Sequence, residues 1–162
     1  MQSLVVLSCC VLASASAGAA FSDPLARNVM MPLSGAAYSD DPQQCVDVVA
    51  PGATVLSQVT LKCDLFHDKC SGFVWVDDAA KVVGLSFRGS TDVEQLVAEA
   101  AGSAMETKDK YPPGGSVSSY FYSAYNKLWN GGLGGVMRDQ IAAHPDYAVY
   151  VTGHSLGGSL AA

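Results

Sequence analysis

The chain has 162 residues, of which 49% are apolar and 15% are charged, and its formal net charge is −6. This length is sufficient for one hydrophobic core of ordinary size, so we expect a single domain. The nine lysine and arginine residues are scattered along the sequence, which argues against a nucleic-acid partner because phosphate binding requires clustered positive charge.

The first residues form an apolar run, Leu4 to Leu12, followed by the small residues Ala13 to Ala20. This order, with A-x-A patterns after the apolar run, is typical of a secretory signal peptide. A membrane-spanning helix would require about 20 apolar residues, roughly twice this run. The sequence therefore predicts a signal peptide over residues 1–17, a domain over 18–162, and a secreted, extracellular protein without a transmembrane segment.

Removal of the signal would leave three cysteines, Cys45, Cys63 and Cys70, in the secreted domain. This odd number in an oxidising compartment predicts one disulfide and one remaining thiol, with all three pairings open. The remaining thiol either pairs with a cysteine outside these residues or is a buried free cysteine. The spacing does not match a zinc-ligand set, and no dinucleotide fingerprint occurs, so neither a metal nor a cofactor is expected.

The first predicted elements in chain order are a helix and four short strands. A capped helix is expected from Asp23 to about Leu33, covering one face of a sheet and ending before Asp40-Asp41-Pro42. β-branched and apolar runs predict the strands, of which the last two form a buried hairpin. The expected strands are Val46 to Val49, Val55 to Leu61, Phe73 to Asp77 and Lys81 to Phe87.

The second half of the chain has mainly helical periodicity before a final strand that begins at Tyr147. Strands that alternate with helices favour a parallel or mixed sheet covered on both faces. The expected elements are a turn at Phe87 to Thr91, a helix at Asp92 to Ala101, a loop at Lys108 to Gly115, and a helix from Val117 to Trp129 that is interrupted at Asn130-Gly131-Gly132 and then continues to His144.

The final strand leads directly into Gly153-His154-Ser155-Leu156-Gly157, followed by small residues that are compatible with a helix. Such a sharp strand-to-helix turn exposes a serine hydroxyl at the sheet edge, where helix amides point toward developing negative charge. Gly153 and Gly157 leave room for the turn. The pattern predicts that Ser155 is the nucleophile of a serine hydrolase, and an ordinary serine of a glycine-rich turn is the alternative.

Three segments together resemble one family: GLSFRGST at 84–91, GGSVSSYFYSAYNKLW at 114–129 and YVTGHSLGGSLAA at 150–162. They are similar to the class 3, fungal-type triacylglycerol lipases, and within them to the secreted animal members, over roughly residues 34–162. The resemblance implies an α/β-hydrolase fold, here partial, with a mixed and mostly parallel sheet and covering helices. It also implies that Ser155 forms an acyl-enzyme and that Ser90 and Leu156 supply the amides of an oxyanion hole.

The chain departs from the family order of Ser, then Asp or Glu, then His, because neither an acid nor a histidine follows Ser155. His154 is adjacent to the nucleophile and is expected to point away from it, and His67 and His144 are expected to be surface or hydrogen-bonded residues. We therefore expect an N-terminal part of a longer lipase, inactive by itself.

The resemblance implies a lipid ester as substrate, with an oil–water interface as a candidate place of action. Residues 91–101 are at the position of the family's lid, and an ordinary core-packing helix is the alternative there. Phospholipid or feruloyl esters are rival substrates. A catalytically silent, secreted lipid-binding protein on the same scaffold is a further alternative.

Overall fold

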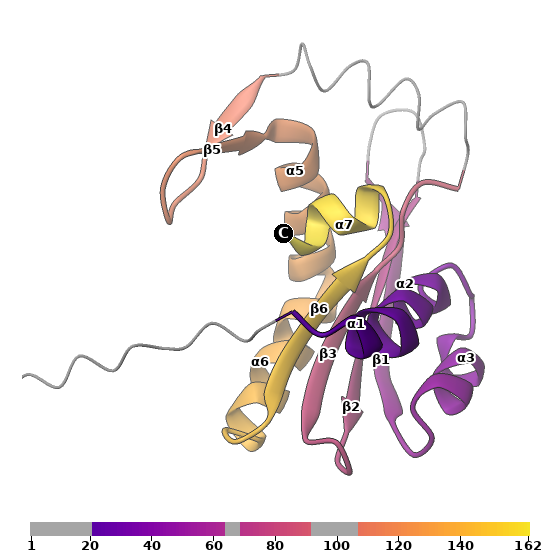
Figure 1. The fold of residues 1–162 in the computed structure, drawn as a ribbon. Helices are drawn as coiled ribbons and strands as arrows, with labels where there is room; N and C mark the ends of the chain where they lie inside the picture. Colours follow the sequence, from indigo (N-terminus) through magenta and orange to yellow (C-terminus); the bar gives the residue numbers. More distant parts are fainter. Residues whose placement is uncertain (1–20, 64–68, 92–106) are drawn as a thin grey trace, which may run out of the picture.

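The computed structural model of this protein describes residues 21–63, 69–91 and 107–162 (Figure 1). The predicted signal peptide, His67 and the candidate lid beyond Thr91 lie outside these residues. The described chain forms a central sheet with helices on both of its faces (Figure 1).

The central sheet has four strands in the order β1-β2-β3-β6. The strands are β1 (Thr54–Lys62), β2 (Lys69–Asp77), β3 (Val82–Phe87) and β6 (Ala148–Gly153). β1 pairs with β2 and β2 with β3 in antiparallel fashion, whereas β3 and β6 are parallel. The expected hairpin of two buried strands is thus β2 and β3, and the sheet is mixed.

The helices divide into two groups, one on each face of the sheet (Figure 1). On one face lie α1 (Asp23–Leu25), η1 (Ala26–Met30), α2 (Met31–Ala36) and α3 (Pro42–Val49); on the other lie α5 (Ser119–Leu128), η2 (Trp129–Leu133), α6 (Gly134–Ala143) and α7 (Leu156–Ala161). Within the described chain, none of these helices has the length and apolar character that crossing a bilayer requires.

Strand β2 explains why both faces are covered. Its side chains alternate between the faces: Phe73 and Trp75 pack with α2 and α3, whereas Val74 packs with α5 and α6. Phe73 and Val74 are completely buried. A strand that is apolar on both faces must be covered on both, which accounts for the three-layer arrangement.

The prediction of a strand at Val46 to Val49 is wrong, because these residues form the end of α3. Pro42 occupies the first turn of this helix, where its missing N–H costs nothing. Val46 is completely buried while Val48 is 81% exposed, so the β-branched run has a helical and not an alternating pattern of burial. The Gln43 side chain bonds the backbone of Val55 at 2.7 Å and thereby fixes α3 beside the start of β1.

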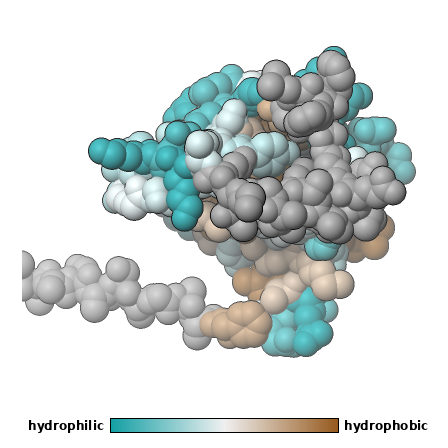
Figure 2. All heavy atoms as spheres, turned by 90° about the horizontal axis from the view of Figure 1, so that it is seen from above, coloured by the Kyte–Doolittle hydropathy of each residue, from teal (hydrophilic) through white to brown (hydrophobic). Residues whose placement is uncertain are grey.

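The predicted loop at Lys108 to Gly115 is also partly wrong. Strand β4 (Lys108–Lys110) pairs with β5 (Ser116–Ser118) in a small antiparallel hairpin. The Pro112-Pro113-Gly114-Gly115 segment forms the turn, which the Gly114 amide closes on the Tyr111 carbonyl at 2.9 Å. The hairpin projects from the body of the molecule, and much of its surface is hydrophilic (Figure 2).

The predicted helix at 117–129 begins only at Ser119, because Val117 and Ser118 belong to β5. Its interruption at 130–132 is confirmed. Ser118 caps α5 by accepting from the Phe121 amide, and the chain widens into the π-helical turn η2 before α6. Gly132 has a φ of 136°, which a residue with a side chain rarely adopts, and this glycine permits the bend between the two helices.

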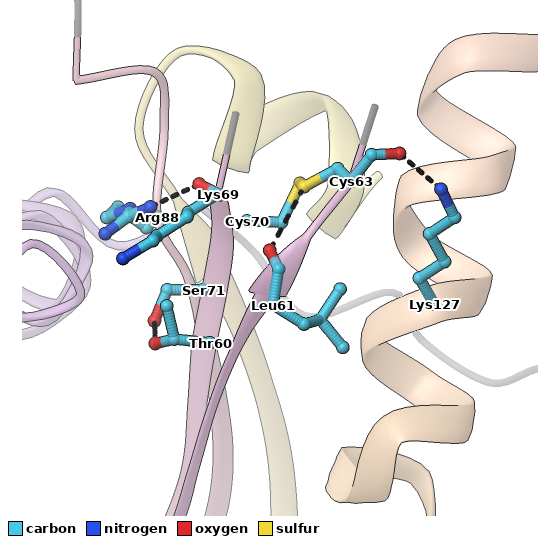
Figure 3. Close-up of a disulfide and its surroundings, with 8 residues drawn as sticks. All are labelled: Thr60, Leu61, Cys63, Lys69, Cys70, Ser71, Arg88 and Lys127. Atoms are coloured by element: carbon cyan, nitrogen blue, oxygen red, sulfur yellow. Dashed lines mark hydrogen bonds between the residues drawn. A yellow bond between two sulfur atoms is a disulfide. The ribbon is translucent and has the colours of Figure 1, made fainter. Parts of the chain in front are cut away.

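The disulfide joins Cys63 to Cys70 and leaves Cys45 as a free, half-buried thiol. It connects the end of β1 to the start of β2 (Figure 3). Hydrogen bonds to backbone oxygens fix both sides: Lys127 Nζ donates to the Cys63 carbonyl at 2.5 Å, and the Arg88 guanidinium donates to the Lys69 carbonyl (Figure 3). The bridge is thus linked both to α5 and to the segment that follows β3.

Removing the disulfide by a Cys63→Ala/Cys70→Ala double substitution is expected to lower the free energy of unfolding by about 2–3 kcal/mol, because the bridge closes a short loop in the unfolded chain. Urea unfolding of the oxidised wild type and the double variant measures this. Cys45→Ala is the matched control and should cost about 1 kcal/mol or less. Equal losses in the two variants would contradict a stabilising role of the bridge.

Candidate active site

Ser155 occupies the turn between β6 and α7, residues 153–157, which we call the elbow. Its backbone angles are φ 57° and ψ −124°. Among the described residues, Lys81 is the only other non-glycine with a positive φ. Such a backbone conformation costs about 1–3 kcal/mol and requires surrounding structure to hold it. Part of that support comes from the amides of Gly157 and Gly158, which bond to the carbonyls of His154 and Ser155 at 2.9 and 2.8 Å. The turn has the sharp strand-to-helix form that the motif predicts.

The two motif glycines lie where no side chain fits. A Cβ at Gly153 would overlap the Gly157 carbonyl group, and one at Gly157 would overlap the Phe87 carbonyl and the Arg88 backbone. These obstacles are backbone atoms, which cannot move aside as a flexible side chain can. The glycines therefore allow α7 to pack directly against the end of β3.

The parallel pairing of β3 and β6 brings the two motif segments to one edge of the sheet. Phe87 is opposite Gly153 in the register, so the residues after each lie side by side at the carboxyl ends of the strands. A Cβ atom placed on Gly89 would lie 3.2 Å from the Cβ of Ser155, so the two segments are in close contact. The Arg88 amide bonds the Ser71 carbonyl at 2.9 Å, which attaches this turn to β2.

Ser90 and Leu156, the predicted oxyanion donors, belong to these adjacent segments. Ser90 follows Gly89 and is half-buried. Leu156 begins α7, and its side chain is buried in the core between α5 and the sheet. Within the described chain, the amides of Gly157, Gly158 and Ser159 bond to carbonyls of the elbow, but no backbone acceptor is paired with the Leu156 amide.

The described histidines are not partners of Ser155. His154 Nδ1 is 3.0 Å from the Tyr38 hydroxyl, and the His144 ring stacks on Tyr147 with 4.4 Å between ring centroids, at the other end of β6. Within the described chain, no side chain is hydrogen-bonded to the Ser155 hydroxyl. The described residues also contain no cluster of three potential metal ligands.

Tyr38 is a site neighbour that the sequence analysis did not identify. It lies just after α2 and contacts the elbow across a separation of 116 residues. Burial raises the pKa of its hydroxyl, a shift opposed by a hydrogen bond with the Gly89 backbone and by the charge of Arg88. No local motif surrounds Tyr38, and its place depends on how α2 packs against the sheet, so a pattern search could not find it.

An apolar cavity of about 420 Å³ lies between β6, α5, α6 and α7. Its walls are mainly aromatic and aliphatic, and they include Tyr125, Trp129 and Leu160. Val149 and Val151 of β6 also line it and are 46% and 38% exposed. Ser155 is not part of its lining, which reaches α7 at Ser159 and Leu160.

Comparison with known proteins connects this geometry to a family. The family described as Lipase (class 3) matches residues 84–162. The chain is 35% identical over 138 residues to a lipase of Caenorhabditis elegans, in an alignment that covers 82% of this chain and 37% of that protein. It is 32% identical over 117 residues to the secreted mono- and diacylglycerol lipase A of Penicillium cyclopium, covering 72% of this chain and 36% of that protein.

Among solved structures, the lipase of Rhizopus microsporus var. chinensis matches with a TM-score of 0.65 and 30% identity, over 82% of this chain and 46% of that one. The chain spans little more than a third of the length of the two relatives above. The sheet order, the elbow at its edge and these matches show part of an α/β-hydrolase fold. The chain therefore belongs to the class 3 lipase family.

Proposed function

We propose that this chain carries the nucleophile of a secreted carboxylic ester hydrolase that acts on acylglycerols. The observation that carries the proposal is the strained backbone of Ser155 next to the turn after β3, at one edge of the sheet. A strained serine persists only where the surrounding structure fixes it, and such positions are concentrated at functional sites.

In the proposed reaction the Ser155 hydroxyl attacks the ester carbonyl and gives its proton to a base. The carbonyl oxygen becomes an oxyanion that accepts hydrogen bonds from the amides of Leu156 and Ser90. Collapse of this intermediate releases the alcohol and leaves an acyl group on Ser155, and water then releases the carboxylic acid. Each oxyanion donor is worth about 2.7–4 kcal/mol of transition-state stabilisation.

We assign the acid and the base of this reaction to polypeptide that follows the elbow in a longer protein. Neither an acid nor a histidine follows Ser155 in this sequence, and His154 is engaged by Tyr38. The relatives' greater length is consistent with this assignment. The 162 residues alone are then expected to show no Ser155-dependent turnover of a short-chain ester.

Two observations support the finer parts of the proposal. The Cys63–Cys70 disulfide suits a secreted protein, because oxidising compartments preserve such bonds. The Penicillium relative is named as a secreted mono- and diacylglycerol lipase, which favours acylglycerols over phospholipid or feruloyl esters. The silent lipid-binding alternative differs in that it predicts binding of lipid without turnover.

The test compares substrates in the protein encoded by the complete transcript. Tributyrin, a phosphatidylcholine and a feruloyl ester are supplied at equal ester concentration, and released acid is titrated. We expect the highest rate on tributyrin. No turnover of any ester would contradict the hydrolase proposal, and a faster rate on phosphatidylcholine would contradict the substrate class. A rise in rate when tributyrin passes from solution to emulsion would support a lid.

A further inference from the structure

The Tyr38 hydroxyl is in contact with the elbow through the residue that precedes Ser155. Its Oη is 3.0 Å from Nδ1 of His154, a normal hydrogen-bond distance. The two rings are tilted by 55° with their centroids 6.1 Å apart. The contact thus connects the end of α2 to the elbow on β6.

The same hydroxyl also contacts the turn after β3. A Cβ at Gly89 would overlap the Tyr38 hydroxyl and the His154 carbonyl. This overlap shows that the Tyr38 hydroxyl lies directly against the Gly89 backbone. One side chain therefore links the residue before Ser90 to the residue before Ser155.

This link matters because two amides on different segments must reach one oxygen. Effective oxyanion donors lie about 2.7–3.1 Å from the position of that oxygen, so a small separation of the segments weakens both bonds. The close packing of Gly157 on Phe87 fixes the elbow and the turn after β3 relative to each other on one side. Tyr38 spans the other side, where Gly89 and His154 meet.

We propose that Tyr38 is a positioning residue that holds the elbow and the turn after β3 at the separation required by the oxyanion donors. This inference rests on the proposed function of Ser155. Tyr38 acts in this role through its contacts with His154 and Gly89. Its hydroxyl, not its ring, makes both contacts, so a phenylalanine should retain the packing and lose the link.

The test is Tyr38→Phe in the ester-hydrolysing protein, with Tyr147→Phe as the matched control. Tyr147 loses a hydroxyl hydrogen bond of the same 3.0 Å length, to Asp78, just before the other end of β6. Tyr38→Phe should lower kcat by about 3- to 10-fold and leave KM within about twofold. The ring ¹⁵N shifts of His154 should also change, because Nδ1 loses its hydrogen-bond partner. Tyr147→Phe should alter neither quantity.

The outcomes separate the inference from the proposed function. An active wild type in which both variants have the same kcat overturns the positioning role. Unchanged His154 ¹⁵N shifts in Tyr38→Phe overturn the link itself. A fall in kcat accompanied by an equal rise in KM shows lost substrate binding and also overturns the inference. A wild type that hydrolyses no ester overturns the proposed function, and the positioning role with it.

Discussion

Replacing Ser155 by alanine is expected to lower kcat/KM for ester hydrolysis by about 10⁴-fold or more in the protein encoded by the complete transcript. The change removes the proposed attacking oxygen, which is the hydroxyl of the strained residue at the elbow. The backbone conformation should be retained, because alanine differs from serine only in lacking the hydroxyl group. Initial rates on a dissolved p-nitrophenyl butyrate and on tributyrin measure the effect.

Ser159→Ala is the matched control for this experiment. Ser159 lies on the same short helix α7 and its side chain is exposed. Its loss should leave the rate within about twofold, and both variants should melt within about 2 °C of the wild type, as surface substitutions usually do. Full activity in Ser155→Ala would contradict the assignment of Ser155 as the nucleophile. Loss of activity in Ser159→Ala alone would point to Ser159 instead.

The second large effect is expected from Gly157→Ala. The added methyl group would overlap the Phe87 carbonyl and the Arg88 backbone, so α7 must move away from β3. Overpacking of this kind typically costs about 1–3 kcal/mol of folding free energy, and occasionally more. Because the movement also separates the two oxyanion segments, activity should fall as well. Urea unfolding and the rate on a dissolved ester measure the two effects.

Gly135→Ala provides the control with the opposite sign. Gly135 lies in α6, and no atom is within 4 Å of the position of its missing Cβ. An alanine there should stabilise the protein by about 0.5–1 kcal/mol, because glycine weakens a helix. Destabilisation by both substitutions to the same extent would show that the contact between α7 and β3 is not the cause.

The elbow was predictable because its signal is local. The strand, the two glycines Gly153 and Gly157 four positions apart, and the following run of small residues are all contained in one short segment. The structure places Ser155 in the strained turn. The hairpin of β2 and β3 was predictable for the same reason, since two buried runs flank a short polar turn. The short distance between Gly89 and Ser155, by contrast, could not be predicted locally, because it depends on the pairing of β3 with β6, which are far apart in the sequence.

The errors arose where tertiary contacts outweighed local preference. The β-branched residues Val46 to Val49 form a helix because Pro42 starts one and Gln43 bonds to the beginning of β1. Tyr38 was missed because its partners, Gly89 and His154, are on other segments and no spacing rule relates them. The disulfide partners could be limited to three pairings but not chosen, because the choice depends on which strands become neighbours.

The parallel pairing of β3 with β6 has a consequence for the order of folding. Val82 is opposite Ala148, so this pairing closes the longest loop of any strand pair in the described sheet, whereas the β1–β2–β3 meander forms between near neighbours. Long loop closure is entropically costly and tends to be slow. Both segments of the candidate oxyanion hole depend on that closure, so a nascent chain would lack their juxtaposition until β6 docks beside β3. Ester hydrolysis by the longer protein would then require this long-range pairing.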